Sequence, residues 1–170
     1  MMKKQIYKST DLQIRGFTLV ELLIYMALVS MFLLVLLDVF TITLSSKLAS
    51  ESTSAISYDS RYILSKLSYD VNNADSVTLP ALGATGASLQ LTSGGVTSTY
   101  TITSGNLVKT VGGVPMSLNG TDTGLDSISF KNLGNPGGKP TIQVVYTVRS
   151  KIVVWGGTQT QTINTTVGTR

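Results

Sequence analysis

The sequence predicts an α+β fold in which one long N-terminal helix packs on an antiparallel, β-rich C-terminal domain. The first observation is an apolar run at residues 17–37, followed by a segment to about residue 72 that also lacks Gly and Pro. The second is an abrupt change of composition: all four prolines and fifteen of the sixteen glycines lie beyond residue 79. Beyond that point, short threonine-rich stretches alternate between apolar and polar side chains, which is typical of antiparallel sheets.

The composition excludes several kinds of chemistry. The 170-residue chain contains no cysteine and no histidine, which rules out disulfides, thiolate metal ligands, thiol nucleophiles and histidine general bases. Asp and Lys residues in the second half are scattered among turns, and no serine lies in a catalytic motif. We therefore expect a protein that is not an enzyme and that needs no cofactor and no metal ion.

The net charge of +4 comes from the N-terminal leader. Lys3, Lys4, Lys8 and Arg15 precede the apolar run, and only Asp11 opposes them. Without residues 1–16 the chain keeps nine basic and eight acidic groups, a net charge of +1. No basic patch for nucleic acid is therefore predicted.

The apolar run is long enough to cross a membrane. Its 21 residues, 17–37, would form a helix of about 30 Å, the thickness of a bilayer core. The basic leader places the N-terminus in the cytoplasm and the chain after residue 38 outside. A conventional secretory signal peptide is the alternative, but such a signal has a shorter apolar region and a small-residue cleavage site after it.

The helix is expected to continue through residues 38–74 as an amphipathic extension. Ala49, Ile56 and Ile63 are seven residues apart, and Leu67 and Val71 continue the same side. We expect this stripe to pack on the protein's own globular domain, at residues 75–170. The opposite, polar side is predicted to contain Glu51, Asp59, Arg61, Lys66 and Asp70.

The globular domain is expected to contain short strands separated by glycine-rich turns and one longer loop at residues 131–140. The predicted strands are residues 87–92, 96–103, 106–111, 114–118, 125–130, 141–148, 151–155 and 159–167.

Glu21 is an unexpected residue in a segment suited to lipid. An ionised side chain there costs on the order of 2.5–3.5 kcal/mol, although Glu21 could reach the nearby cytoplasmic surface. The surrounding residues, Gly16-Phe17-Thr18-Leu19-Val20-Glu21 after a basic leader, resemble the class III signal of type IV prepilins and type II secretion pseudopilins. The resemblance implies that a prepilin peptidase removes residues 1–16 and methylates the new amine of Phe17.

The same resemblance implies a role for Glu21 in assembly. In that family the corresponding carboxylate is thought to pair with the N-terminal ammonium of a neighbouring subunit. The physics is consistent, because opposite charges in a low dielectric attract strongly and each is costly when unpaired. Such a pair would fix the axial offset between packed helices.

Two short segments suggest which kind of subunit this is. Residues 58–77 and the C-terminal "TINTTVGTR" resemble J-type minor pseudopilins and W-type minor pilins. Asp38 also departs from the proline that is common after the apolar run in major pilins. A minor subunit is therefore favoured over a major one.

Two features of the domain leave alternatives open. Asn119, Asp122 and Asp126 offer oxygen ligands suited to calcium, but turns select the same residues for backbone reasons. Trp155, beside Gly156 and Gly157, is either a surface contact or a core or hairpin aromatic.

The resemblance implies a pilin-like structural subunit of a type IV pilus or a type II secretion pseudopilus. Its expected partners are prepilin peptidase, other pilin or pseudopilin subunits, the inner-membrane assembly platform and, before assembly, membrane lipid. It would be a single-pass cytoplasmic membrane protein before it enters a filament. The alternative is a membrane-anchored surface protein whose β-domain binds a ligand.

Overall fold

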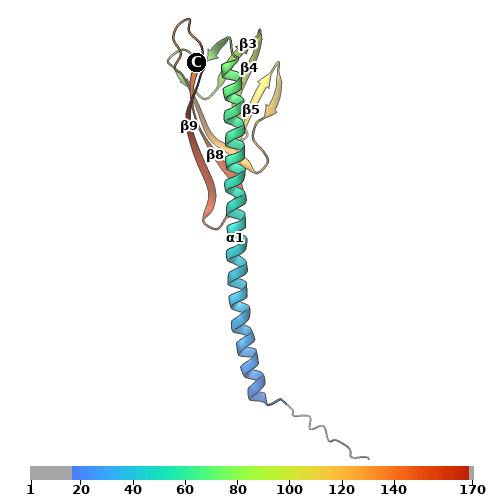
Figure 1. Cartoon of the computed structure of the whole chain (residues 1–170). Helices are drawn as coiled ribbons and strands as arrows, with labels where there is room; N and C mark the ends of the chain where they lie inside the picture. The colour runs from blue at the N-terminus through green and yellow to red at the C-terminus, as the bar shows by residue number, and fades with distance from the viewer. Residues whose placement is uncertain (1–16, 169–170) are drawn as a thin grey trace, which may run out of the picture. The chain divides into compact units, whose positions relative to one another are not determined.

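The computed structural model describes residues 17–168, which form one helix and nine strands (Figure 1). The predicted class is confirmed: a long N-terminal helix packs on antiparallel sheets. The elements are α1 (Leu19–Asn72), β1 (Ser76–Leu79), β2 (Thr85–Gly86), β3 (Leu89–Ser93), β4 (Val96–Thr103), β5 (Asn106–Val111), β6 (Val114–Ser117), β7 (Thr123–Asn132), β8 (Thr141–Val154) and β9 (Gly157–Gly168).

The chain divides into two compact units, Met1–Ile42 and Thr43–Arg170. In the described part of the first unit, α1 exposes large apolar side chains on every side, with exposed fractions of 47–76% between Phe17 and Leu37. An 18-residue window of this helix has a mean hydropathy of 2.6, and none of it is buried. By length and composition, the helix can therefore cross a membrane.

Hydroxyl groups in this apolar section donate to carbonyls of the helix itself. Ser30 Oγ donates to the Met26 carbonyl at 2.7 Å, and Thr41 Oγ1 donates to the Leu37 carbonyl at 2.6 Å. Such bonds allow serine and threonine to enter hydrocarbon without leaving an unpaired polar group.

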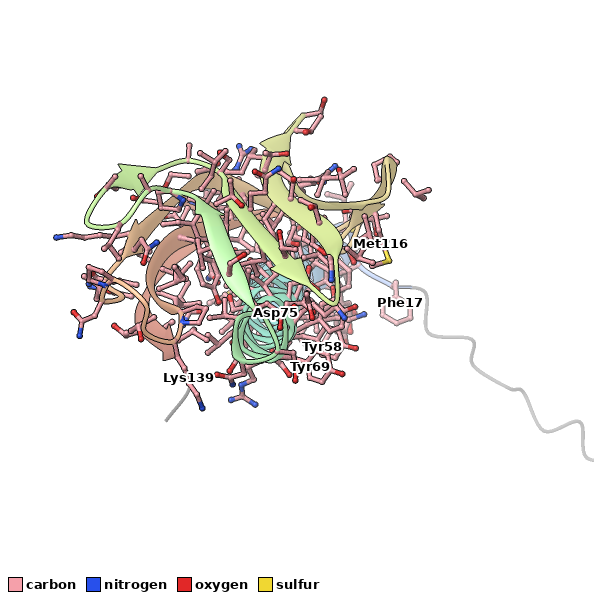
Figure 2. All side chains as sticks on the ribbon, turned by 90° about the horizontal axis from the view of Figure 1, so that it is seen from above. Phe17, Tyr58, Tyr69, Asp75, Met116 and Lys139 are labelled. Atoms are coloured by element: carbon pink, nitrogen blue, oxygen red, sulfur yellow. The ribbon has the colours of Figure 1, made fainter. Side chains whose placement is uncertain are left out.

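The second unit contains two sheets with the strand orders β1-β3-β4-β5-β6 and β2-β7-β8-β9. Every pairing among the described strands is antiparallel. Figure 2, seen along α1, shows the sheets on one side of the helix and the labelled Tyr58 and Tyr69 on the side away from them. The core joins the helix to both sheets and includes Ile63, Leu67, Tyr100, Phe130 and Tyr146, all with no exposed surface.

The predicted apolar stripe of the helix is confirmed, because Ile56, Ile63, Leu67 and Val71 are buried. The predicted polar side needs a correction at two positions. Asp59 is only 7% exposed, and the side chain of Asp70 is only 13% exposed. Both lie at the borders of the buried stripe, where the domain supplies polar partners.

Most predicted strands agree with the structure, and the differences have local causes. The predicted strands 141–148 and 151–155 form one strand, β8, which ends at Val154, because the irregular pairing with β9 between Arg149 and Val153 does not interrupt it. Ser150 is buried there and accepts a hydrogen bond from the Ile152 amide at 3.1 Å. The short strands β1 and β2 were not predicted, since four and two residues show no periodicity.

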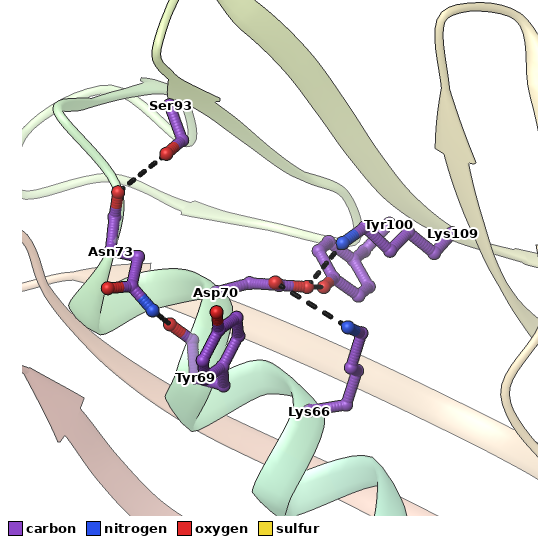
Figure 3. Close-up of polar contacts among 7 residues, drawn as sticks. All are labelled: Lys66, Tyr69, Asp70, Asn73, Ser93, Tyr100 and Lys109. Atoms are coloured by element: carbon purple, nitrogen blue, oxygen red, sulfur yellow. Dashed lines mark hydrogen bonds and ion pairs between the residues drawn. The ribbon is translucent and has the colours of Figure 1, made fainter.

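Asp70 connects the end of α1 to the first sheet (Figure 3). Its Oδ2 lies 2.5 Å from Lys109 Nζ and accepts a hydrogen bond from the Tyr100 hydroxyl, while its Oδ1 lies 3.9 Å from Lys66 Nζ. Burial, followed by the interaction with Asp70, raises the pKa of Tyr100 well above its ordinary value. The phenol therefore remains a donor to the carboxylate.

Two further polar connections lie about three turns earlier on α1, at Asp59 and Ser60. Asp59 Oδ2 accepts a hydrogen bond from the Gly120 amide at 2.8 Å and another from the Thr123 hydroxyl. Tyr146, on β8, donates to the Ser60 carbonyl at 2.8 Å. Hydrogen bonds thus connect α1 both to the loop before β7 and to the centre of the second sheet.

We predict that Asp70→Asn destabilises the domain by about 3–5 kcal/mol, because it leaves Lys109 buried without its counter-charge. The measurement is the free energy of unfolding of the full chain in detergent, from urea titrations monitored by near-ultraviolet circular dichroism. Glu51→Gln is the control: Glu51 pairs with Lys47 at 3.7 Å, both are well exposed, and such a pair contributes about 0–1 kcal/mol. Similar small losses in the two variants would contradict a buried ion pair at Asp70.

We predict that Tyr146→Phe reduces the loss of stability at alkaline pH. Burial raises the pKa of Tyr146 to about 12, so the folded chain keeps this proton above pH 10 while the unfolded chain releases it. This difference stabilises the unfolded state as pH rises and amounts to about 1 kcal/mol by pH 11. The fall in unfolding free energy between pH 8 and pH 11 should therefore be smaller by that amount in the variant.

The matched control is Tyr58→Phe, since Tyr58 is 73% exposed and its hydroxyl is not buried by folding. It should show the same alkaline fall as the unaltered chain. An identical fall in Tyr146→Phe would mean that the buried phenol does not contribute to the pH dependence.

Candidate processing and assembly site

The predicted site lies at the start of α1, where Thr18 ends the non-helical segment. The Glu21 amide donates to Thr18 Oγ1 at 3.2 Å, and the Leu22 amide donates to the Thr18 carbonyl at 3.1 Å. Thr18 is therefore the N-cap, which satisfies one of the amides that a helix start leaves unpaired.

This cap was not predicted, although the sequence contains its signal. Thr18 and Glu21 have the Thr-x-x-Glu spacing of a capping box, in which the acidic side chain can return to the backbone of the cap residue. The Thr18 hydroxyl accepts from the Glu21 amide, which is the first of the two bonds of that pattern.

Phe17 lies immediately before the N-cap residue Thr18, and it is 71% exposed. Its ring packs edge-on against Tyr25, with centroids 6.0 Å apart and an interplanar angle of 66°. Gly16, the other half of the predicted cleavage site, lies outside the described residues, as does the rest of the leader. On the described side of the bond, the chain from Phe17 to Thr18 is not helical.

Glu21 is partly exposed in the first turn of α1. A carboxylate at this position interacts favourably with the positive end of the helix dipole. Cleavage before Phe17 would add an ammonium group four positions earlier in the chain. The arrangement can therefore present one negative and one positive charge at the same end of an otherwise apolar helix.

The possible calcium ligands in the β-domain have other contacts. The Asn119 side chain accepts from the Leu107 amide at 2.9 Å and donates to the Thr123 carbonyl at 3.0 Å. Asp126 pairs with Arg149 at 3.0 Å. Within residues 17–168, no three acidic side chains lie in a group that could hold a metal ion, and Asn119 connects β5 to the start of β7.

Trp155 lies in the turn between β8 and β9, and it is 93% exposed. It is thus a hairpin aromatic and not a core residue.

Comparison with protein families finds a match over residues 13–37, to the family described as the prokaryotic N-terminal methylation motif. Comparisons with curated proteins and with solved structures found no match. The matched segment contains Gly16, Phe17 and Glu21, so it overlaps every residue of the predicted site. The match covers the leader and the apolar section of α1, and all the described strands lie outside it.

Proposed function

We propose that the chain is a minor structural subunit that prepilin peptidase cuts between Gly16 and Phe17 and methylates at Phe17. The mature subunit enters, or initiates, a type IV pilus or a type II secretion pseudopilus. The observation that carries this proposal is the methylation motif at residues 13–37, which continues directly into a capped helix with exposed apolar side chains.

The exposed apolar helix is stable only when other apolar groups surround it. Burying a Val, Leu, Ile or Phe side chain is favourable by about 1.5–3 kcal/mol relative to leaving it in water. Lipid covers it while the subunit is stored in the membrane. Helices of neighbouring subunits cover it in the filament. Assembly therefore exchanges one apolar environment for another. Apolar contacts alone do not fix the axial position of one helix relative to its neighbour, so a further interaction is required as a guide.

The charges at the start of the helix supply that guide. The methylated ammonium at Phe17 and the Glu21 carboxylate are each costly when unpaired in an apolar bundle. Pairing Glu21 with the ammonium of the next subunit removes both costs at one axial offset. The platform in the inner membrane would bring the subunits together.

The proposed domain organisation follows the same division. Residues 1–16 are a cytoplasmic leader, 17–37 cross the membrane, 38–74 extend the helix and 75–170 form the outer globular domain. The proposal of a minor subunit is supported by Asp38, which is exposed on α1 directly after the apolar run. A charge at that position is easier to accommodate at a filament tip than inside a densely packed shaft.

We predict that Gly16→Val prevents processing, because a branched side chain replaces the smallest residue at the bond to be cut. The chain is expressed with and without a prepilin peptidase, and its N-terminus and intact mass are determined. The unaltered chain should begin at Phe17 only when the peptidase is present. Ala27→Val adds comparable volume within the apolar run and should be processed normally.

Full maturation of the Gly16→Val chain would exclude this cleavage site. An intact leader on the unaltered chain under both conditions would favour a membrane-anchored surface protein with a ligand-binding β-domain.

We predict that Glu21→Gln leaves processing intact but reduces incorporation into filaments about tenfold or more, the effect of losing at least about 1.4 kcal/mol of charge pairing. Glutamine keeps the size of the side chain and its capacity to complete a capping box, so the variant removes only the charge. The measurement is the amount of mature subunit in sheared and purified filaments relative to the membrane fraction.

Two controls separate assembly from helix capping. Glu51→Gln removes an exposed carboxylate elsewhere on α1 and should assemble normally. Thr18→Val removes the cap hydroxyl but keeps the Glu21 charge. Normal incorporation of Glu21→Gln together with poor incorporation of Thr18→Val would assign the site to capping and contradict the assembly role.

A further inference from the structure

The loop between β6 and β7, residues 118–122, contains the dipeptide Asn119-Gly120. Asn119 is the only asparagine in the chain that precedes a glycine. Such a pair is chemically labile in flexible peptides, because glycine has no side chain to hinder the approach of its backbone nitrogen to the asparagine Cγ. The domain therefore places a labile pair at the position where Asn119 connects β5 to β7.

Both polar atoms of the Asn119 side chain have partners. Its Oδ1 accepts from the Leu107 amide at 2.9 Å. Its Nδ2 donates to Asn106 Oδ1 at 3.0 Å and to the carbonyls of Gly120 and Thr123 at 3.2 Å and 3.0 Å. The residue is also buried. Because these contacts fix the side chain, Asn119 cannot turn freely to bring its Cγ against the Gly120 nitrogen.

The backbone nitrogen of Gly120 is engaged as well. Its N–H donates to Asp59 Oδ2, on α1, at 2.8 Å, and the Thr123 hydroxyl donates to the same oxygen. This amide must lose its proton before the nitrogen can act as a nucleophile. A carboxylate beside it disfavours that loss, because two negative charges would then be adjacent. Asp59 therefore lowers the reactivity of the pair from the helix side.

The glycine that makes the pair labile is also the residue that allows its protection. A Cβ at Gly120 would lie 3.3 Å from Asp59 Oδ2, closer than an ordinary van der Waals contact. A larger residue here would remove the lability only by shifting the loop or the Asp59 carboxylate. The contact with α1 and the labile pair are therefore coupled.

We propose that Asn119 is a deamidation site that the contact between Asp59 and Gly120 keeps unreactive. When the contact opens, the deprotonated Gly120 nitrogen attacks Asn119 Cγ and a C–N bond forms. The bond from Cγ to Nδ2 breaks, and the amide proton passes through solvent to the departing NH2 group, which leaves as ammonia. Water then opens the succinimide ring at either carbonyl and gives aspartate or isoaspartate at position 119. Water is the only co-reactant, and nothing is oxidised or reduced.

Deamidation would keep the loop from returning to its place. An aspartate at position 119 has no side-chain N–H, so the carbonyls of Gly120 and Thr123 would lose their donor. Isoaspartate would also lengthen the backbone by one carbon. A temporary separation of α1 from the loop would thus become permanent.

The test compares the full chain in detergent with a synthetic peptide of residues 115–124 that has blocked ends, both in the same mildly alkaline buffer. Peptide mapping with mass spectrometry follows the replacement of the Asn119 NH2 group by OH. The peptide should convert at least about a hundredfold faster than the folded chain, because the open form of the loop is a minor population of that chain.

Variants of Asp59 test whether its contact is responsible for the protection. Asp59→Asn keeps an acceptor but removes the charge, and Asp59→Ala removes both. Asn119 should convert about tenfold faster or more in Asp59→Ala than in the unaltered chain, with Asp59→Asn between them. Asp70→Asn is the matched control, because Asp70 is on the same helix but contacts Tyr100 and Lys109 instead of the loop. All chains are compared at equal free energy of unfolding, adjusted with urea, so that global unfolding contributes equally.

Slow conversion in the unaltered and Asp70→Asn chains, with fast conversion in the Asp59 variants, supports the proposal. Conversion of the folded, unaltered chain at the rate of the peptide overturns it, as does a peptide that does not convert. Asp59 variants that convert as slowly as the unaltered chain also overturn it, and so does an Asp70→Asn chain that converts as fast as they do. If Asp59→Ala does not fold, Asp59→Asn decides the result.

Discussion

The structure depends on the burial of one face of α1 against two sheets. Neither sheet could be stable alone, because each would expose the residues that now contact Ile63, Leu67 and Val71. The helix needs the sheets as well, since its serine-rich middle section has low intrinsic helix propensity. The polar connections at Asp59, Ser60 and Asp70 lie along the edges of this contact.

The two sections of α1 meet different physical requirements with the same backbone. Before Thr43 the helix is apolar on every side and needs lipid or other helices as its surroundings. After Thr43 it has a buried stripe for its own domain and an exposed side with Tyr58 and Tyr69. This division explains why one continuous helix belongs to two compact units.

Sequence patterns predicted the features that repeat and missed those that depend on a single contact. Long or repeating patterns could be predicted from the sequence alone. They include the apolar run, the stripe from Ile56 to Val71 and the strands separated by glycines. The sequence does not show which distant residue a charged side chain will contact. Asp59 and Asp70 were therefore predicted on the polar, solvent-facing side of α1. Thr123 and Lys109 become their neighbours only after the chain folds.

The candidate site shows the same limit. Gly16, Phe17 and Glu21 could be singled out because they form a contiguous motif, and the family match covers the same segment. The Thr18 cap is equally local and could have been predicted from its spacing to Glu21. The exposure of Trp155 could not, because a tryptophan beside two glycines fits a packed turn as well as a projecting one.

The polar connections at Asp59, Ser60 and Asp70 have a mechanical consequence. They are distributed over about 16 Å of the helix rather than gathered at one end. A force along the helix axis loads them in shear, so all of them must yield together before α1 slides out of the domain. A force across the axis would instead peel them apart one after another. The domain is therefore mechanically anisotropic and resists a pull along the axis of α1 most strongly.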